Sequence, residues 1–161
     1  MFGLKKKQTA RPVIAAPVDG RYVAIEDVAD PLFSQKAMGE GFGIDPIAPT
    51  VYSPVIGTIN SVFKTKHAIG ITTDEGLEVL IHIGLDTVKL NGRPFDMLAG
   101  TGQRVEVGTP LVDVDMKQIT AAGLDPVVLT LITNSAEKVA AVSFAGESLK
   151  HGDAVGDVTV A

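Results

Sequence analysis

A repeated pattern of glycines and short apolar runs is the feature that most constrains how this chain can fold. The segment Gly102-x-x-Val105-x-x-Gly108-x-x-Leu111-x-Asp113-Val114 recurs as Gly146-x-x-Leu149-x-x-Gly152-x-x-Val155-x-Asp157-Val158. A shorter pattern, Ala16-Pro17-Val18-Asp19-Gly20, recurs as Ser53-Pro54-Val55-Ile56-Gly57. Glycine turns recur by chance in β proteins, but agreement at this many positions favours a duplicated strand–turn unit.

Between the repeats, apolar and polar residues alternate over short stretches, which is typical of half-buried strands. Gly 17 and Pro 9 are more than long helices tolerate. The sequence therefore predicts an all-β domain, sandwich or barrel, with two short helices, Pro31–Met38 after the N-cap Asp30 and Asp115–Ala122 before Gly123. The predicted strands are Tyr22–Ile25, Thr58–Phe63, Lys66–Ile71, Glu78–Ile83, Leu111–Val114, Val127–Ile132 and Val139–Phe144.

Composition limits the class of protein. With 161 residues, the chain is long enough for one domain with a proper core. It contains no cysteine, which rules out disulfides and thiolate metal sites. Its net charge of −5 argues against nonspecific binding of nucleic acid, and no apolar run reaches the roughly 18 residues of a membrane span.

The N-terminal residues differ in character from the rest of the chain. A basic cluster, Lys5-Lys6-Lys7, follows Met1–Leu4 without an apolar h-region, so the segment is not a secretory signal. We predict a flexible tail at residues 1–11 and a single domain at residues 12–161. The alternative for the tail is weak contact with an anionic membrane surface through Phe2, Leu4 and the lysines.

Two of the three histidines, His67 and His82, lie on either side of one predicted hairpin with its turn at Thr73–Gly76. If Asp74 and Glu75 form a two-residue turn, His67 directly faces His82, with Cβ atoms about 4.5–5.5 Å apart. A bulge at Gly76 would shift the register and make the contact diagonal. Two histidines on one small patch can bind a metal or move a phosphoryl group.

Phosphoryl chemistry suits such a pair. A neutral imidazole is a good nucleophile near neutral pH, because its ordinary pKa is about 6.5. Attack on a phosphoryl group gives a phosphohistidine, and the charge on the phosphoryl oxygens needs a nearby donor, which His67 can supply. Thr65 lies two residues before His67 and can hydrogen-bond to it, while Asp86 can orient His82.

Metal and nucleotide chemistry have weaker support in the sequence. A zinc hydrolase needs a third protein ligand, for which Asp86, Glu78 and His151 are candidates, but no HExxH or His-x-His spacing occurs. No GxxxxGK[ST] or GxGxxG motif occurs either. The phosphoryl donor would then be another protein or a small phosphorylated molecule. We interpret His151 as an exposed loop residue.

Several motifs together resemble the glucose-class enzyme IIA of the bacterial phosphoenolpyruvate:sugar phosphotransferase system. The resemblance covers roughly residues 12–161, and its most specific part is the run that begins at His82. The motifs are Ala16-Pro17-Val18-Asp19-Gly20, Ile25-Glu26-Asp27-Val28-Ala29-Asp30, Gly39-x-Gly41-x-Gly43-Ile44, Ser53-Pro54-Val55-x-Gly57-Thr58-Ile59, Thr65-x-His67-Ala68, His82-Ile83-Gly84-Leu85-Asp86-Thr87-Val88 and Gly102-Gln103-Arg104-Val105-x-Val107-Gly108.

The resemblance implies an antiparallel β-sandwich built on a duplicated hybrid motif. It also implies a cytoplasmic phosphotransferase component that needs no cofactor. His82 would accept a phosphoryl group from the histidine-containing phosphocarrier protein and pass it to a cysteine of an enzyme IIB domain in a sugar permease. His67 would stabilise the phosphoryl group, with support from Thr65, Gly84 and Asp86.

The resemblance further implies a docking patch beside the histidines. For its helix residues, ordinary core packing is the alternative interpretation. In some relatives the two histidines also form a zinc site that a partner's carboxylate completes, which stays open for His67 and His82. The residues assigned to the patch are Leu32, Phe33, Met38, Phe63, Ile69 and Leu80.

Two other functions stay open on the sequence. One is a zinc hydrolase on a related fold, like the lysostaphin-type peptidases. The other is a regulatory binding module that has lost phosphoryl transfer. The sequence does not indicate the sugar, the permease, the regulatory targets, the oligomeric state, or whether the protein makes transient contact with the inner face of the membrane.

Overall fold

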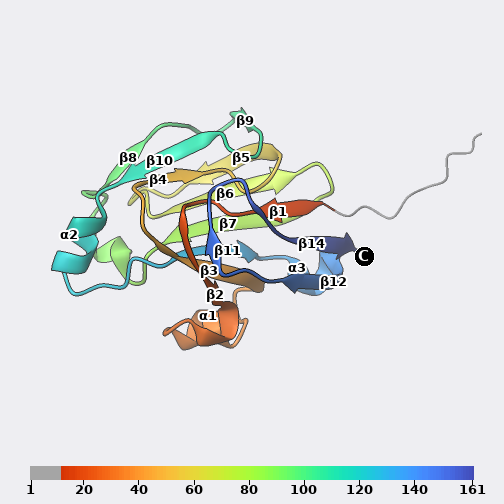
Figure 1. Cartoon of the computed structure of the whole chain (residues 1–161). Helices are drawn as coiled ribbons and strands as arrows, with labels where there is room; N and C mark the ends of the chain where they lie inside the picture. Colours follow the sequence, from red (N-terminus) through yellow and green to blue (C-terminus); the bar gives the residue numbers. More distant parts are fainter. Residues whose placement is uncertain (1–11) are drawn as a thin grey trace, which may run out of the picture.

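The structure, a computed structural model, describes residues 12–161 and consists mainly of antiparallel strands (Figure 1). The tail predicted at residues 1–11 lies outside the described residues. The predicted antiparallel all-β fold is confirmed. One large sheet has eight strands, in the spatial order β13 (Ser148–Leu149), β2 (Gly20–Ala24), β3 (Glu40–Pro46), β11 (Val128–Ile132), β7 (Glu78–Ile83), β6 (Ala68–Thr73), β5 (Gly57–Val62) and β9 (Arg104–Val105).

Two three-stranded sheets complete the strands. One has the order β1 (Val13–Ala15), β14 (Ala154–Val160), β12 (Val139–Phe144), and the other β4 (Thr50–Tyr52), β10 (Pro110–Val114), β8 (Phe95–Met97). The helices are short: α1 (Pro31–Ser34), α2 (Met116–Ala121), α3 (Ser135–Lys138) and the 3₁₀ segments η1 (Ile25–Asp27) and η2 (Thr87–Leu90). Within the described residues, none of the helices has the length and hydropathy to cross a membrane.

The apolar residues form two separate cores on the two faces of the large sheet. The main core joins the large sheet to both small sheets and includes Phe42, Ile81, Leu111 and Val158, each fully buried. A smaller core lies on the other face and gathers Ile25, Val28, Phe33, Leu85, Val127, Leu129 and Leu131. Alternation along β7 therefore sends Val79, Ile81 and Ile83 into the main core and leaves His82 on the opposite face.

The duplication read from the sequence is present in the backbone. Gly108 and Gly152 both turn with φ near +90°, and their N–H groups donate to the carbonyls of Ser53 and Ala16, which begin the shorter repeats. In the same way, β9 pairs with β5 as β13 pairs with β2. The two copies thus occupy equivalent places in two halves of the molecule.

The two halves meet between β7 and β11, the central pair of the large sheet. Just beyond this pair, the Gly84 N–H donates to the Val127 carbonyl and the Thr133 N–H donates to the Glu78 carbonyl. Each bond joins the residue just after one strand to a residue at, or just before, the start of the other strand, so β7 and β11 occupy equivalent positions. Functional residues on one half therefore have structural counterparts on the other half.

The predicted elements differ from the structure in several places. Helix Pro31–Met38 ends at Ser34, because Lys36 takes a left-handed φ of +62° that an α-helix cannot include. Helix α3 was not predicted, and neither was the interior strand β3. The other strands that were not predicted are β1, β4, β8, β9, β13 and β14. Strand β3 was missed because its glycines interrupt the alternation of apolar and polar residues. The structure requires Gly41, because a Cβ there would clash with the Thr130 carbonyl of β11.

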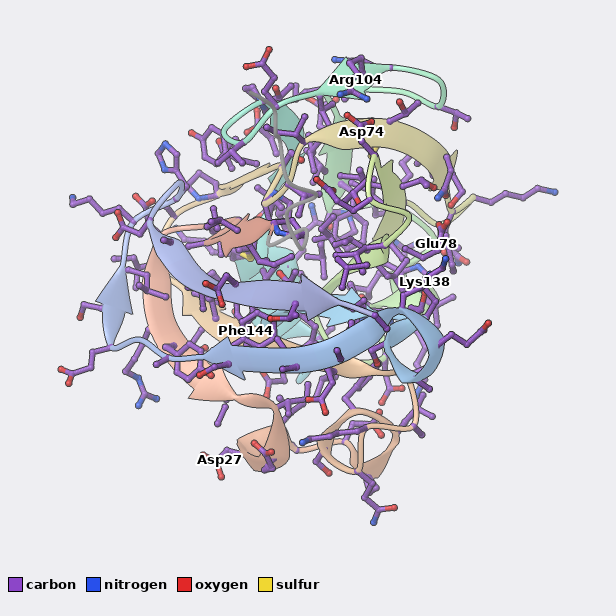
Figure 2. All side chains as sticks on the ribbon, turned by 90° about the vertical axis from the view of Figure 1, so that its right-hand side faces the viewer. Asp27, Asp74, Glu78, Arg104, Lys138 and Phe144 are labelled. Carbon is purple, nitrogen blue, oxygen red and sulfur yellow. The ribbon has the colours of Figure 1, made fainter. Side chains whose placement is uncertain are left out.

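The predicted register of the histidine hairpin was wrong. The structure pairs Ala68, not His67, with His82. The loop has three residues, Asp74, Glu75 and Gly76, because Gly76 adopts φ +91° and the Thr73 N–H donates to the Leu77 carbonyl. The bulge at Gly76, which was the alternative prediction, is what the chain adopts. At the tip, Asp74 binds Arg104 of β9 through two 2.7 Å bonds (Figure 2).

Candidate phosphoryl-transfer site

His82 lies on β7, on the face that carries the smaller core. Its ring packs against Phe33 of α1, with ring centroids 5.1 Å apart. Nδ1 of His82 is buried, and the Gly84 backbone accepts a hydrogen bond from the protonated ring. The other ring nitrogen, Nε2, is therefore the one available to a reactant.

His67 precedes β6 and reaches the same place by a different route. Lys66 adopts a left-handed φ of +60° and turns the chain immediately before His67. The His67 carbonyl accepts the Ile83 N–H at 2.8 Å, which ties the two histidine backbones together. His67 is 7% exposed, and Thr65 Oγ1 lies 2.7 Å from its Nδ1.

The two imidazoles meet despite the shifted register. Their ring centroids are 5.0 Å apart and the planes stand at 83°. The edge of one ring therefore faces the other ring, within reach of a small group bound between them. Phe63 packs edge-on against His67 from the outside, with centroids 5.4 Å apart.

Both histidines are held in the neutral form. Burial, then the neighbouring His67, lower the pKa of His82 to about 4, although the Gly84 backbone, Asp30 and Asp86 act in the opposite direction. Burial also lowers the pKa of His67. At neutral pH each ring therefore has one nitrogen with a free lone pair and one that carries a proton.

Two carboxylates border the histidine pocket, which has a volume of about 110 Å³. Asp30 caps α1 by accepting the Leu32 N–H at 3.0 Å, and Asp86 begins η2 with a left-handed φ of +61°. Asp86 was predicted to lie at the site, whereas Asp30 was predicted only as a helix cap. Asp30 is far from both histidines along the chain, so nothing in the sequence indicated that it borders the pocket.

The loop after His82 is fixed by Gly84 and Thr87. Gly84 has φ +75°, and an added Cβ would lie 2.5 Å from Thr87 Cγ2. Thr87 is fully buried, and its hydroxyl donates to the Ile83 carbonyl. Because the His67 carbonyl holds the N–H of the same residue, Ile83 is held from both sides and the loop has little freedom. Thr87 was missed as a site residue in the sequence analysis.

The residues assigned to the docking patch divide by accessibility. Leu32 and Phe63 are 49% and 43% exposed, and Val88, which was not predicted, is 46% exposed. Met38 and Leu80 are half-buried against the smaller core. Ile69 was wrongly assigned, because it points into the main core with no exposed surface. Phe33 is 4% exposed, so it forms the wall behind His82.

The candidates for a third zinc ligand do not all come to the site. Asp86 lines the pocket, whereas Glu78 bonds to Asn60 and Thr72, and His151 bonds to Asp19 and stacks on Tyr52. Within residues 12–161, no group of three or more histidine, cysteine, aspartate or glutamate residues has the arrangement of a metal site.

Comparisons with known proteins identify the family of this chain. Residues 12–138 match the family described as phosphoenolpyruvate-dependent sugar phosphotransferase system, EIIA 1. A glucose-specific EIIA component from Staphylococcus aureus (strain MRSA252) is 44% identical over 162 residues, which cover 99% of this chain and 97% of that protein. One from Staphylococcus epidermidis (strain ATCC 12228) is 45% identical over 135 residues, which cover 84% and 81%.

A solved structure extends the agreement to the fold. Glucose permease IIA from Mycoplasma capricolum superimposes with a TM-score of 0.81 at 33% sequence identity, covering 98% of this chain and 99% of that one. The chain therefore belongs to the EIIA family of the phosphoenolpyruvate-dependent sugar phosphotransferase system, whose members carry phosphoryl groups in sugar uptake.

Proposed function

We propose that Nε2 of His82 is the atom that carries the phosphoryl group. The observation behind this assignment is the burial of Nδ1, which leaves Nε2 as the nitrogen open to the pocket. A proton on Nδ1 leaves the lone pair on Nε2, and the lowered pKa keeps the ring in this neutral form at neutral pH.

The transfer is a balanced exchange of P–N bonds. The Nε2 lone pair forms a bond to phosphorus as the P–N bond of the phosphocarrier protein's histidine breaks, and its electron pair returns to the donor imidazole. In the next step a cysteine thiolate of an enzyme IIB domain attacks phosphorus. The bond to Nε2 breaks, its electron pair returns to His82, and the ring is neutral again.

His67 stabilises the phosphoryl oxygens in this proposal. If the Thr65 hydroxyl donates to Nδ1 of His67, the proton of the neutral ring resides on Nε2. That N–H can then donate to a phosphoryl oxygen on His82, since the rings are 5.0 Å apart. Thr65 acts as a positioning residue that selects this tautomer.

Asp30 and Asp86 give the site a second property. Their carboxylates border the pocket in which the negatively charged phosphoryl group would lie. The two carboxylates and the phosphoryl group carry like charges in one pocket, so they destabilise the phosphorylated state unless a cation lies between them. A basic side chain from a docked partner would stabilise that state. The phosphorylated state of the free protein is then less stable, which favours transfer of the phosphoryl group to the next protein.

Both partners need access to one nitrogen, so they share one docking surface. Leu32, Phe63 and Val88 supply exposed apolar area next to the histidine pair. We infer that the phosphocarrier protein and the enzyme IIB domain bind there in turn, in the cytoplasm. The names of the relatives point to glucose as the sugar served.

The EIIA family needs no cofactor for transfer. The two imidazoles can still supply two of the four ligands of a tetrahedral zinc ion, with the others coming from a bound protein. Zinc would hold the rings and block Nε2 of His82. The proposal places no zinc in the transfer step.

Labelling from phosphoenolpyruvate tests the assignment, with enzyme I and the phosphocarrier protein as the donors. Wild type should take up one phosphoryl group, and His82→Gln should take up none. His67→Gln should still accept the group but pass it to enzyme IIB at least tenfold more slowly. His151→Gln is the matched control and should behave as wild type. Labelling of His82→Gln would defeat the proposal.

A further inference from the structure

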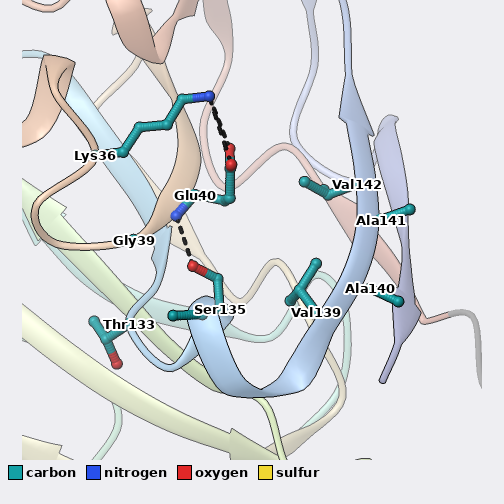
Figure 3. A pocket seen from close by; sticks show the side chains of 10 residues that line it. Lys36, Gly39, Glu40, Thr133, Ser135, Val139, Ala140, Ala141 and Val142 are labelled. Carbon is teal, nitrogen blue, oxygen red and sulfur yellow. Dashed lines mark hydrogen bonds and ion pairs between the residues drawn. The ribbon is translucent and has the colours of Figure 1, made fainter.

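A second and larger hollow lies between β12 and the segment that leads into β3 (Figure 3). We call it the β12 groove. Its volume is about 470 Å³, several times that of the histidine pocket. The Glu40 N–H donates to Ser135 Oγ at 3.0 Å across its floor. The lining residues are Lys36, Gly39, Glu40, Thr133, Ser135, Ala136, Val139, Ala140, Ala141 and Val142.

The β12 groove lies at the counterpart of the histidine pocket in the other half of the molecule. Glu40 pairs with Ile132 in the way that His67 meets Ile83, and left-handed Gly39 precedes Glu40 as left-handed Lys66 precedes His67. A site with the same backbone plan thus exists without histidines. Phosphoryl transfer makes no use of it.

One wall of the groove is an open strand edge. Strand β12 ends its sheet. Val139 and the residues from Ala141 to Phe144 pair with β14, with a register shift at Ala140, and Figure 3 shows β14 on the side away from the groove. The strand reads Val-Ala-Ala-Val-Ser-Phe, without charge or proline. Its counterpart β8 has three residues with Asp96 at the centre. Long uncharged edges readily accept an added strand.

The rim of the groove is acidic. Glu26 and Glu40 share the ammonium of Lys36, at 3.2 and 3.4 Å, so this cation is already neutralised. Glu137 is exposed nearby in α3, whereas the Lys138 side chain lies over the turn at Gly76. A ligand with apolar residues and positive charge would complement both the wall and the rim.

We propose that the β12 groove binds the chain's own N-terminal segment, residues 1–11, as a strand added beside β12. The segment has this chemistry: Phe2 and Leu4 would fall on one face of a strand, followed by Lys5-Lys6-Lys7. The apolar pair covers Val139 and Val142, and the lysines meet the acidic rim.

The point where the segment joins the domain favours this occupant. The Pro12 carbonyl accepts the Val158 N–H, and Val158 pairs on its other side with Val142 of β12. The join is therefore two strand spacings, about 10 Å, from β12, and an added strand would lie one spacing, about 5 Å, further on. Eleven extended residues span up to about 36 Å, enough to round the end of β14. Tethering gives a local concentration of about millimolar, which a free peptide would not reach.

Paramagnetic NMR on the full chain tests the proposal. The sequence has no cysteine, so Gly3→Cys gives a single site for a nitroxide label. The amide signals of Ala140–Val142 should lose more than half their intensity in dilute protein. Adding Ala141→Lys, which places a charge on the exposed face of β12, should restore them. Ala121→Lys, on the exposed side of α2, is the matched control and should leave the broadening unchanged.

Other occupants give other results. Equal broadening in a mixture of nitroxide-labelled unenriched protein and unlabelled ¹⁵N protein would mean a second copy, and would overturn the proposal. Broadening that appears only with vesicles of anionic phospholipid would also overturn the proposal. The absence of any broadening at β12 would overturn it as well. Phosphoryl acceptance should be unchanged in Ala141→Lys and Ala121→Lys, so this test is independent of the proposed function.

Discussion

At the scale of single residues, the site depends on buried polar atoms and on the partner that each one has. Nδ1 of His67 has Thr65, the Thr87 hydroxyl has the Ile83 carbonyl, and the ring of His82 has the Gly84 backbone. The first two bonds fix geometry. Because Nδ1 of His82 is buried, Nε2 of the same ring is the nitrogen that remains for chemistry.

Thr65→Val should separate acceptance from transfer. The substitution keeps the shape of the side chain but removes the hydroxyl that sets the His67 tautomer. A lost hydrogen bond of about 1.4 kcal/mol corresponds to a tenfold slower transfer to enzyme IIB. Rapid-quench kinetics would measure both steps, and Thr65→Ser should recover the rate. Equal slowing of acceptance and transfer would argue against a tautomer role.

Thr130 and Thr87 allow a comparison of how a buried hydroxyl group affects stability with and without a hydrogen-bond partner. Both are buried, at 1% and 0% exposure, but the Thr130 hydroxyl has no hydrogen-bond partner among the described residues. Thr130→Val should raise the free energy of unfolding by about 1 kcal/mol, whereas Thr87→Val should lower it by about 1–3 kcal/mol. Urea denaturation would measure both. Destabilisation by Thr130→Val would mean that the hydroxyl has a bond in solution.

The pKa of His82 predicts how stability depends on pH. Its value in the folded protein is about 4, below the ordinary 6.5. As the pH falls below 6.5, the unfolded chain takes up the proton first, so stability should decline until the pH reaches about 4. Ring-proton NMR should give a His82 midpoint near 4. A midpoint at or above 6.5 would contradict a neutral, buried nucleophile.

At the scale of elements, two turns with left-handed residues, Gly76 and Lys36, show what the sequence could and could not reveal. The sequence predicted the hairpin with its turn near Asp74–Gly76. It could not distinguish a two-residue from a three-residue loop, because a glycine at position 76 suits both. Helix α1 was visible at its cap, Asp30, but its early end depends on the conformation of Lys36. Tertiary contacts made both choices.

Gly76→Ala and Gly84→Ala should therefore differ. Both glycines have positive φ, which costs an alanine about 1 kcal/mol. At Gly76 the nearest atoms to an added Cβ are 3.9 Å away, on the flexible Lys138 side chain, so activity should persist. At Gly84 the Cβ would clash with Thr87, so Gly84→Ala should lose both stability and phosphoryl acceptance. Equal activity in the two variants would argue against a fixed loop after His82.

At the scale of the whole molecule, internal duplication explains why sequence reasoning succeeded with the fold and only partly with the site. The repeats and alternation predicted the β class. The family resemblance at residues 82–88 implied the histidine roles, which stay a prediction. The assignment of Ile69 to the surface failed because strand parity changes with one residue of register. Asp30 and Thr87 were missed because their contacts form only when distant segments pack together.

The central claim is that Nε2 of His82 carries the phosphoryl group beside a neutral His67. Nitrogen-15 and phosphorus-31 NMR of the protein phosphorylated from phosphoenolpyruvate tests it most directly. The prediction is a one-bond phosphorus–nitrogen coupling to Nε2 of His82, with the His67 proton on Nε2. A coupling to Nδ1 of His82, or to either nitrogen of His67, would contradict the account.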